Sequence, residues 1–296
     1  MRKSFLLSTL LSSLLFSGEF EWGKGTIEVK GGFLGLTGTI SDDIDTYALV
    51  ENHKNIFNTN IFYGYDLVFF DSQTIKQLQN NYNSGASQAN SLINSSGMGN
   101  NYIEVPTIEH RLKGVDAGVT LGYDILHKSE SDYLGVGLYL GISAPYIKSK
   151  KSDSNAISNA LASAYKTSKT EFTTYKVGVG IYAQKSLTDL ISTYGSAIYA
   201  YQKASVKNSY AKSDFSVNGN YLELNAGLKF QPLKEDYDLG IITFSPRLYA
   251  KIGWRYREWN VDNIAINLSG IASIKTPKSD MKFSTNVAYI GLGYSF

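Results

Sequence analysis

The chain ends in the stretch Ala288-Tyr-Ile-Gly-Leu-Gly-Tyr-Ser-Phe296, and this stretch decides the fold. Counting back from the last residue, every second position is apolar or aromatic as far as Ala288. The positions between them include Gly291, Gly293 and Ser295. Successive side chains of a β-strand point to opposite faces, so one face of this strand is apolar and the other is small. A strand that has lipid on one side and a packed lumen on the other needs this arrangement.

The opposite end of the chain is typical of an exported protein. Met1-Arg2-Lys3 precedes an apolar run over 5–16, which predicts a signal peptide over 1–18. This run is too short to span a bilayer as a helix. No later stretch is apolar enough to do so, and we therefore expect any membrane span to consist of strands. The chain has no Cys, which excludes disulfides and thiolate metal sites.

The last strand resembles that of Gram-negative outer-membrane β-barrel proteins, which the barrel assembly machinery reads. Gly291, Tyr294 and Phe296 match the pattern of that signal, whereas Ile290 stands where a polar residue is usual. The resemblance implies a bacterial outer-membrane location and the small OmpA/OmpX-like eight-stranded type. It also implies outer-membrane lipid as surroundings, and the assembly machinery and periplasmic chaperones as partners during biogenesis.

Eight segments of barrel-strand length show a period of two, and Gly falls on one face of several of them. They predict an all-β, transmembrane, antiparallel up-and-down barrel over 57–296, with eight strands as the main expectation and ten as the alternative. The segments are 57–71, 108–126, 133–148, 171–185, 191–207, 216–231, 239–258 and 281–296.

The links between these segments alternate in length. Short links at 127–132, 185–190 and 232–238 fit periplasmic turns, and longer links fit extracellular loops. Helical spacing predicts short helices in the loops over 72–94 and 152–165.

Residues 19–56 fit this scheme less well. A strand over 26–40 and an amphipathic helix over 42–56 are both consistent with the pattern. One extra strand would spoil the even count. We therefore interpret 19–56 as an N-terminal element that plugs the barrel, covers its periplasmic mouth or lies on the membrane.

Charged residues on the inward positions of the strands predict an ion-pair network in the lumen. An eight-stranded barrel is just wide enough to be filled by side chains, and an unpaired buried charge is costly. The alternative is a narrow anion pathway lined by Arg247, Lys251 and Arg255. The inward set is Asp66, Asp116, Asp124, Lys176, Glu223, Lys229, Arg247, Lys251 and Arg255.

The sequence offers little for catalysis. His53, His110 and His127 have no metal-ligand spacing, and no phosphate-binding or nucleotide motif is present. His110 lies near the predicted outer rim, where the lipid A palmitoyltransferase and the omptin proteases place catalytic residues, but no further motif of either family is present.

These observations predict a non-enzymatic barrel with no cofactor and no metal, which acts structurally or through its extracellular loops. A channel for small solutes, favoured by ten or more strands, and a rim-sited enzyme are the alternatives. The net charge of +2 gives no indication of nucleic-acid binding, and we expect a monomer.

Overall fold

The computed structural model describes most of the barrel wall and several of its connections. The expected signal peptide and both predicted loop helices lie outside the described residues. The described residues are 18–31, 39–54, 56, 59–72, 108–126, 132–151, 169–208, 215–232, 237–238, 243–244, 247–264, 267–268, 274–275 and 279–294.

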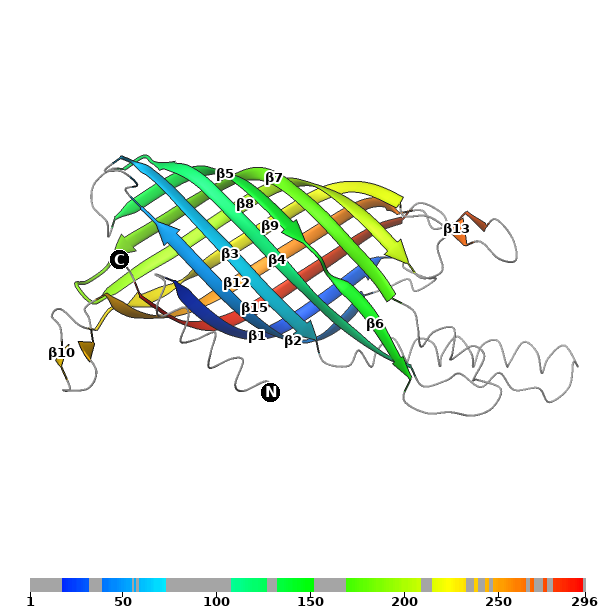
Figure 1. Ribbon diagram of the computed structural model, residues 1–296, viewed down its shortest axis with the longest axis horizontal. Helices are drawn as coiled ribbons and strands as arrows, with labels where there is room; N and C mark the ends of the chain where they lie inside the picture. Colours follow the sequence, from blue (N-terminus) through cyan, green and yellow to red (C-terminus); the bar gives the residue numbers. More distant parts are fainter. Residues whose placement is uncertain are drawn as a thin grey trace, which may run out of the picture.

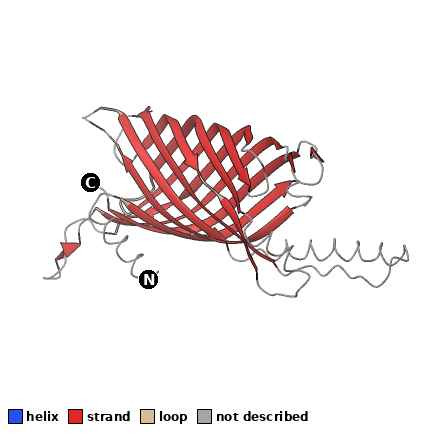
Figure 2. Cartoon of the chain, turned by 45° about the vertical axis from the view of Figure 1, so that its right-hand side comes forward, coloured by secondary structure: helices blue, strands red, loops and turns tan. Residues whose placement is uncertain are grey.

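These residues form a closed antiparallel β-barrel, which is seen from two sides in Figure 1 and Figure 2. Its wall has ten strands in the part of the chain described, and the fifth is interrupted and carries two labels. The wall strands are β1 (Glu19–Gly31), β2 (Thr39–His53), β3 (Ile61–Ser72), β4 (Ile108–Asp124), β5 (Tyr133–Ser143) with β6 (Tyr146–Lys151), β7 (Lys169–Ser186), β8 (Ile191–Asn208), β9 (Phe215–Phe230), β12 (Leu248–Ile264) and β15 (Ser279–Tyr294).

Each strand pairs with its neighbours in sequence order, and the first strand closes the barrel on the last. Glu19 of β1 lies opposite Gly293 of β15, and the pairing continues to Gly31 opposite Met281. Two small hairpins lie outside the wall. They are β10 (Tyr237–Asp238) with β11 (Thr243–Phe244), and β13 (Asn267–Leu268) with β14 (Ile274–Lys275).

The eight-strand prediction is wrong, and the ten-strand alternative is confirmed for the described residues. The interpretation of 19–56 as a separate element is also wrong, because β1 and β2 are wall strands paired with each other. A helix over 42–56 is excluded for the same reason, since this segment largely coincides with β2. Two added strands, rather than one, keep the count even. Among the described residues, no helix is long and apolar enough to span a bilayer.

The interruption between β5 and β6 has a local cause. Pro145 has no backbone N–H and cannot donate to the ladder, so the strand breaks there. The backbone groups around the break still find partners. The amide of Ala144 donates to Val115 over 2.8 Å, and the Pro145 carbonyl accepts from Phe172 over 2.9 Å.

The outer face of the wall carries an apolar belt. Leu138, Leu140, Val177 and Ile252 are each more than half exposed, as are many other aliphatic side chains at alternate positions. Their neighbours along the strands are buried in the lumen. A water-soluble protein rarely leaves so much contiguous apolar surface uncovered, whereas a bilayer covers it.

The two ends of the barrel differ. The amide of Tyr294 bonds to the carbonyl of Gly18 over 3.3 Å, so both ends of the described chain meet at one mouth (Figure 1). We call this mouth the terminal end and the opposite mouth the far end. The connections 54–60, 125–132, 187–190 and 231–247 lie at the terminal end, and the remaining wall connections lie at the far end, among them 73–107 and 152–168.

Candidate functional site: the lumen

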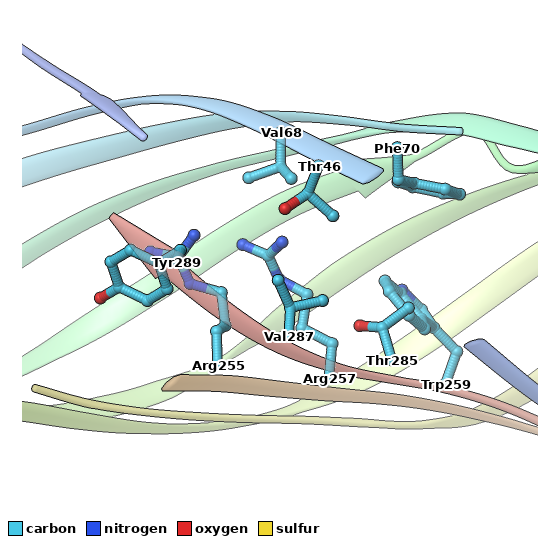
Figure 3. Close-up of a pocket in the computed structure, with 9 residues that line it drawn as sticks. All are labelled: Thr46, Val68, Phe70, Arg255, Arg257, Trp259, Thr285, Val287 and Tyr289. Carbon is cyan, nitrogen blue, oxygen red and sulfur yellow. The ribbon is translucent and has the colours of Figure 1, made fainter. Parts of the chain in front are cut away.

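Two arginines on β12 form the centre of the lumen. Ile252 and Trp254 face outward, so the period of two turns Arg255 and Arg257 inward, where both are buried. Figure 3 shows their side chains next to each other between Tyr289 and Trp259. Two neighbouring guanidinium groups repel each other, and carboxylates from other strands must compensate for them.

Arg257 joins opposite walls of the barrel. Its Nε lies 2.9 Å from the Glu223 carboxylate on β9 and 3.5 Å from Asp116 on β4. Its terminal nitrogen lies 3.3 Å from Asp66 on β3. The strands β3 and β4 are separated from β12 by at least three others on either side of the ring. The ion pairs with Asp66 and Asp116 therefore cross the lumen, whereas Glu223 lies directly opposite Arg257 on the neighbouring strand β9.

Arg255 binds the N-terminal strand to the same group. Its guanidinium donates to both oxygens of Glu21 on β1, over 2.6 and 3.1 Å, which is the bidentate geometry of a strong pair. It also lies 3.6 Å from Glu223. Glu223 therefore receives contacts from both arginines.

Lys176 completes this layer from β7. Its ammonium pairs with Asp116, and neither side chain has any exposed surface. Asp116 also accepts hydrogen bonds from Ser143 over 2.7 Å and from Tyr221 over 3.2 Å. The same ammonium lies 3.7 Å from the centre of the Tyr221 ring. The ion-pair layer thus consists of Glu21, Asp66, Asp116, Lys176, Glu223, Arg255 and Arg257.

An apolar layer lies between the ion-pair layer and the far end. The rings of Phe172 and Phe283 meet edge to face with centres 5.3 Å apart, and Trp259 lies 6.3 Å from Phe70. The indole of Trp259 donates to Ser143 over 3.1 Å, which ties the two layers together. An ion that entered this layer would lose its hydration, and a water molecule would lose hydrogen bonds, so entry is unfavourable.

Little open space remains between the two layers. One cavity lies beside Arg255 and Arg257, with Val68, Phe70 and Val287 also in its lining (Figure 3). A second lies among Phe70, Phe172 and Phe283. Each has an open volume of about 10 Å³, roughly what one water molecule needs. The side chains of the described residues therefore leave little space at these two cavities.

A polar cluster of Glu19, Lys229, Tyr249 and Lys251, which we call the vestibule, lies on the other side of the ion-pair layer, toward the terminal end. Lys251 pairs there with Glu19, which also accepts a hydrogen bond from Tyr249 over 3.1 Å. The Lys229 ammonium lies 4.0 Å above the Tyr249 ring. Tyr194 and Tyr289 share a hydrogen bond of 2.6 Å and separate the vestibule from Arg255.

The structure brings five of the nine predicted lumen residues together in the ion-pair layer and places the other four elsewhere. Asp124 is buried but accepts backbone hydrogen bonds from Leu126 and Leu134 near the terminal end. Lys229 and Lys251 lie opposite each other in the vestibule. Arg247 is exposed and lies just before β12. The predicted strand began at residue 239, whereas β12 begins at Leu248.

Three central residues were missed by the sequence reasoning. Glu19 and Glu21 belong to the N-terminal segment that was not interpreted as wall. Arg257 follows Arg255 by two positions, and the period of two that placed Arg255 inward was the signal that could have found it.

Two of the three residues of the predicted assembly signal, Gly291 and Tyr294, lie among the described residues. Gly291 faces the lumen, where a Cβ atom would lie 2.6 Å from a Glu19 oxygen. Tyr294 ends β15 opposite Leu248, and Phe296 lies outside the described residues.

The histidines do not come together in the described residues. His53 ends β2, where it bonds to Glu51 and stacks on Tyr63 with ring centres 4.7 Å apart. The backbone of His110 belongs to β4. The side chain of His110 and the whole of His127 are not among the parts that the structure describes. No group of three or more potential metal ligands occurs among the described side chains.

A closed antiparallel barrel with an apolar outer belt and buried charged side chains inside defines the class: the protein is a membrane β-barrel of the outer-membrane type. No protein-family model matches the chain, and no curated relative matches it.

Solved structures give barrel matches at low identity. The outer membrane protease OmpT from Escherichia coli aligns at 10% identity over 95% of this chain and 97% of its own, with a TM-score of 0.46. The Pseudomonas putida toluene transporter TodX aligns at 10% over 95% and 90%, with a TM-score of 0.31. Ail, the attachment invasion locus protein of Yersinia pestis, aligns at 11% over 94% and 99%, with a TM-score of 0.26. The three proteins are a protease, a toluene transporter and an attachment invasion locus protein, and no specific role follows for this chain.

Proposed function

We propose that this protein is a closed outer-membrane scaffold that presents its far-end connections outside the cell, and that it is neither an open channel nor an enzyme. One observation carries the proposal. Side chains of the ion-pair layer and the apolar layer reach across the lumen, and the two cavities beside them have open volumes of only about 10 Å³ each. Function then falls to the polar connections, since loops on a rigid barrel are where such proteins bind partners.

The channel alternative gains from the strand count, because ten strands enclose a wider lumen than eight. Two features oppose it. Lys251 and Arg255, which would line an anion pathway, are paired with Glu19 and Glu21. Among the described residues, the cavity in the apolar layer is lined by aromatic and aliphatic side chains apart from Thr174, so few groups there could replace the hydration of a passing ion.

Conductance in planar bilayers tests closure directly. The folded wild-type protein should give no steady current above the lipid background. Arg255→Ala should not convert it into a selective pore, since the apolar layer remains. A steady wild-type current whose ion preference changes in Arg255→Ala would contradict the proposal and favour the channel.

The proposed sidedness needs a separate test. An epitope inserted at Gly97, in the far-end connection 73–107, should be reached by antibody on intact cells. An epitope inserted at Glu235, between β9 and β12 at the terminal end, should become accessible only after the outer membrane is permeabilised. Reversed labelling would place the far end in the periplasm and contradict surface presentation.

A further inference from the structure

The apolar belt narrows on the outer face of β1 and β2, which lie side by side in the wall (Figure 1). Ile44 and Ala48 of β2 are buried, so the odd-numbered residues of this strand face outward. Only two apolar positions there separate Asp45 from Glu51. By contrast, four successive outward positions of β5 are exposed aliphatic residues, namely Val136, Leu138, Leu140 and Ile142.

The distance between the two acidic residues of β2 is short for a membrane span. From 45 to 51 the strand advances about 20 Å along its own direction, at roughly 3.3 Å per residue. With a tilt of about 40° this is about 15 Å across the membrane, whereas the apolar band of a barrel is about 25 Å tall. Lipid therefore does not match this face as it matches β5.

The outer face of β1 changes at the same level. Trp22 is 40% exposed, and the next outward residue is Lys24, whose side chain is 68% exposed. Lys24 lies directly opposite Asp45 in the pairing of β1 with β2. Their charged atoms are 3.9 Å apart, and 36% of the Asp45 side chain is exposed. This loose contact leaves both groups with surface for a further partner.

The acidic groups nearest to this pair have contacts of their own. Asp43 lies one outward position further toward the far end, opposite Thr26 and not opposite Lys24. Three more acidic residues on the outer face of β1, β2 and β3 are already paired: Asp71 with Arg111 and Lys113, Glu28 with Lys30, and Glu51 with His53. At the level of Lys24, the face therefore presents one exposed cation beside one exposed carboxylate.

This arrangement of charges is self-complementary. Two barrels inserted in the same direction can be related by a twofold axis along the membrane normal. If the axis passes between β1 and β2, β1 of each copy faces β2 of the other. Residues that are opposite each other in the pairing of β1 with β2 lie at similar heights, so Lys24 faces Asp45 of the second copy, and Trp22 faces its Tyr47. Both contacts occur twice, as an isologous interface requires.

We propose that the outer face of β1 and β2 binds a second copy of this chain, and that the protein is a symmetric dimer in the membrane. Trp22 and Tyr47 form the centre of the interface, where aromatic residues are common. The two contacts between Lys24 and Asp45 form its rim toward the far end. The expectation of a monomer concerns a wall without β1 and β2, and these two strands carry the face. The dimer does not depend on whether the lumen is closed.

Charge exchange between two differently tagged copies tests the symmetry. A Lys24→Glu homodimer places two carboxylates at each contact, and an Asp45→Lys homodimer places two ammonium groups there. Because the axis repeats each contact, the dimer dissociation constant of either variant should rise about 10- to 100-fold. Sedimentation of the folded full chain in mild detergent measures this rise. Lys203→Glu is the control, since Lys203 is exposed on β8 across the ring, and it should dimerise like the wild type.

The two charge variants should rescue each other. When they are co-expressed, both contacts of the mixed dimer again join opposite charges, so a dimer that carries both tags should be recovered. The contact between Lys24 and Asp45 within one chain cannot produce this rescue.

Cysteine cross-linking tests the same face in the outer membrane and keeps both charges in place. The chain has no Cys, so an introduced one is unique. Copies with Trp22→Cys mixed with copies with Tyr47→Cys should give a product of twice the chain mass with a short bis-maleimide. Val179→Cys mixed with Tyr199→Cys is the matched control, because these exposed residues are also directly opposite each other, but on β7 and β8. This control should give no such product. If a charge variant fails to show heat-modifiable mobility and is therefore unfolded, the cross-linking decides.

Three results would overturn the proposal. The first is a wild-type chain that is monomeric in detergent and gives no product from Trp22→Cys with Tyr47→Cys. The second is a dimer that Lys24→Glu does not weaken, or that cross-links equally through β7 and β8. The third is a cross-linked product of another mass, which would identify a different protein on this face.

Discussion

Removing Arg257 should be among the most damaging single changes in the lumen. Its guanidinium contacts Glu223, Asp116 and Asp66, whose side chains are 6%, 0% and 17% exposed. In Arg257→Ala the ion-pair layer keeps its four carboxylates and retains only Lys176 and Arg255 as cations. Removing one partner of a buried pair typically costs about 3–5 kcal/mol, because the remaining charges stay buried without compensation. The unfolding equilibrium constant should therefore rise by roughly two to four orders of magnitude.

Urea unfolding of the barrel in lipid or detergent, followed by tryptophan fluorescence and by heat-modifiable gel mobility, measures this loss. Lys185→Ala is the control, since an exposed pair contributes only about 0–1 kcal/mol. The double variant Arg257→Met with Asp66→Asn should recover part of the loss, because it removes one carboxylate together with the cation. A loss below about 1 kcal/mol for Arg257→Ala would refute the reasoning, since it would mean that water already solvates these carboxylates.

Two further predictions concern the wall. Replacing Tyr294 and Phe296 by Ser should reduce the folded fraction in the outer membrane, because two aromatic side chains of the proposed assembly signal are removed. Loss of heat-modifiable migration on gels measures this reduction. Folding at the wild-type level would rule the signal out. Gly219→Ala should destabilise the barrel by about 1–3 kcal/mol in the same urea assay, since a Cβ there would lie 1.8 Å from the Asn260 carbonyl oxygen. Gly195→Ala is its control, with its nearest contact at 3.3 Å, and an equal loss in both variants would contradict the steric argument.

The strands from β3 onward could be predicted because the middle of their outer face is mostly apolar. In β5 and β7 the apolar residues alternate with Gly, Tyr and Lys, and both strands lie within a few residues of their predicted bounds. β1 and β2 lack this pattern. The outward positions of β1 include Lys24, and those of β2 include Asp43 and Asp45. The sequence of these two strands therefore does not indicate an outer face in contact with lipid. Buried and less buried side chains still tend to alternate along β1 and β2. Because charged residues stand at outward positions, this alternation is not visible as an alternation of apolar and polar residues.

The direction of each lumen charge could be predicted, but its partner could not. Direction is local, because two neighbouring exposed side chains fix which way a residue points. Which residue a lumen charge pairs with depends on the number of strands and on the shift in register between them. In the ten-stranded ring these bring β12 opposite β3 and β4. The pairing of Arg257 with Asp66 joins residues 191 positions apart and exists only in the closed ten-stranded ring.

The glycines that first marked the inner face also explain how a ten-stranded lumen can be closed. A wider barrel needs larger inward side chains to fill it, and these need room against the wall. The Tyr139 hydroxyl lies where a Cβ on Gly118 or Gly141 would fall, at 2.7 Å in both cases. The Tyr194 hydroxyl likewise occupies the space beside Gly227 and Gly253. Small residues on the inner face therefore indicate places where tyrosine rings from nearby positions lie flat against the wall. Abundant Gly together with abundant Tyr on inward positions is what a filled lumen requires, whereas an open pore would leave the space above those glycines to water.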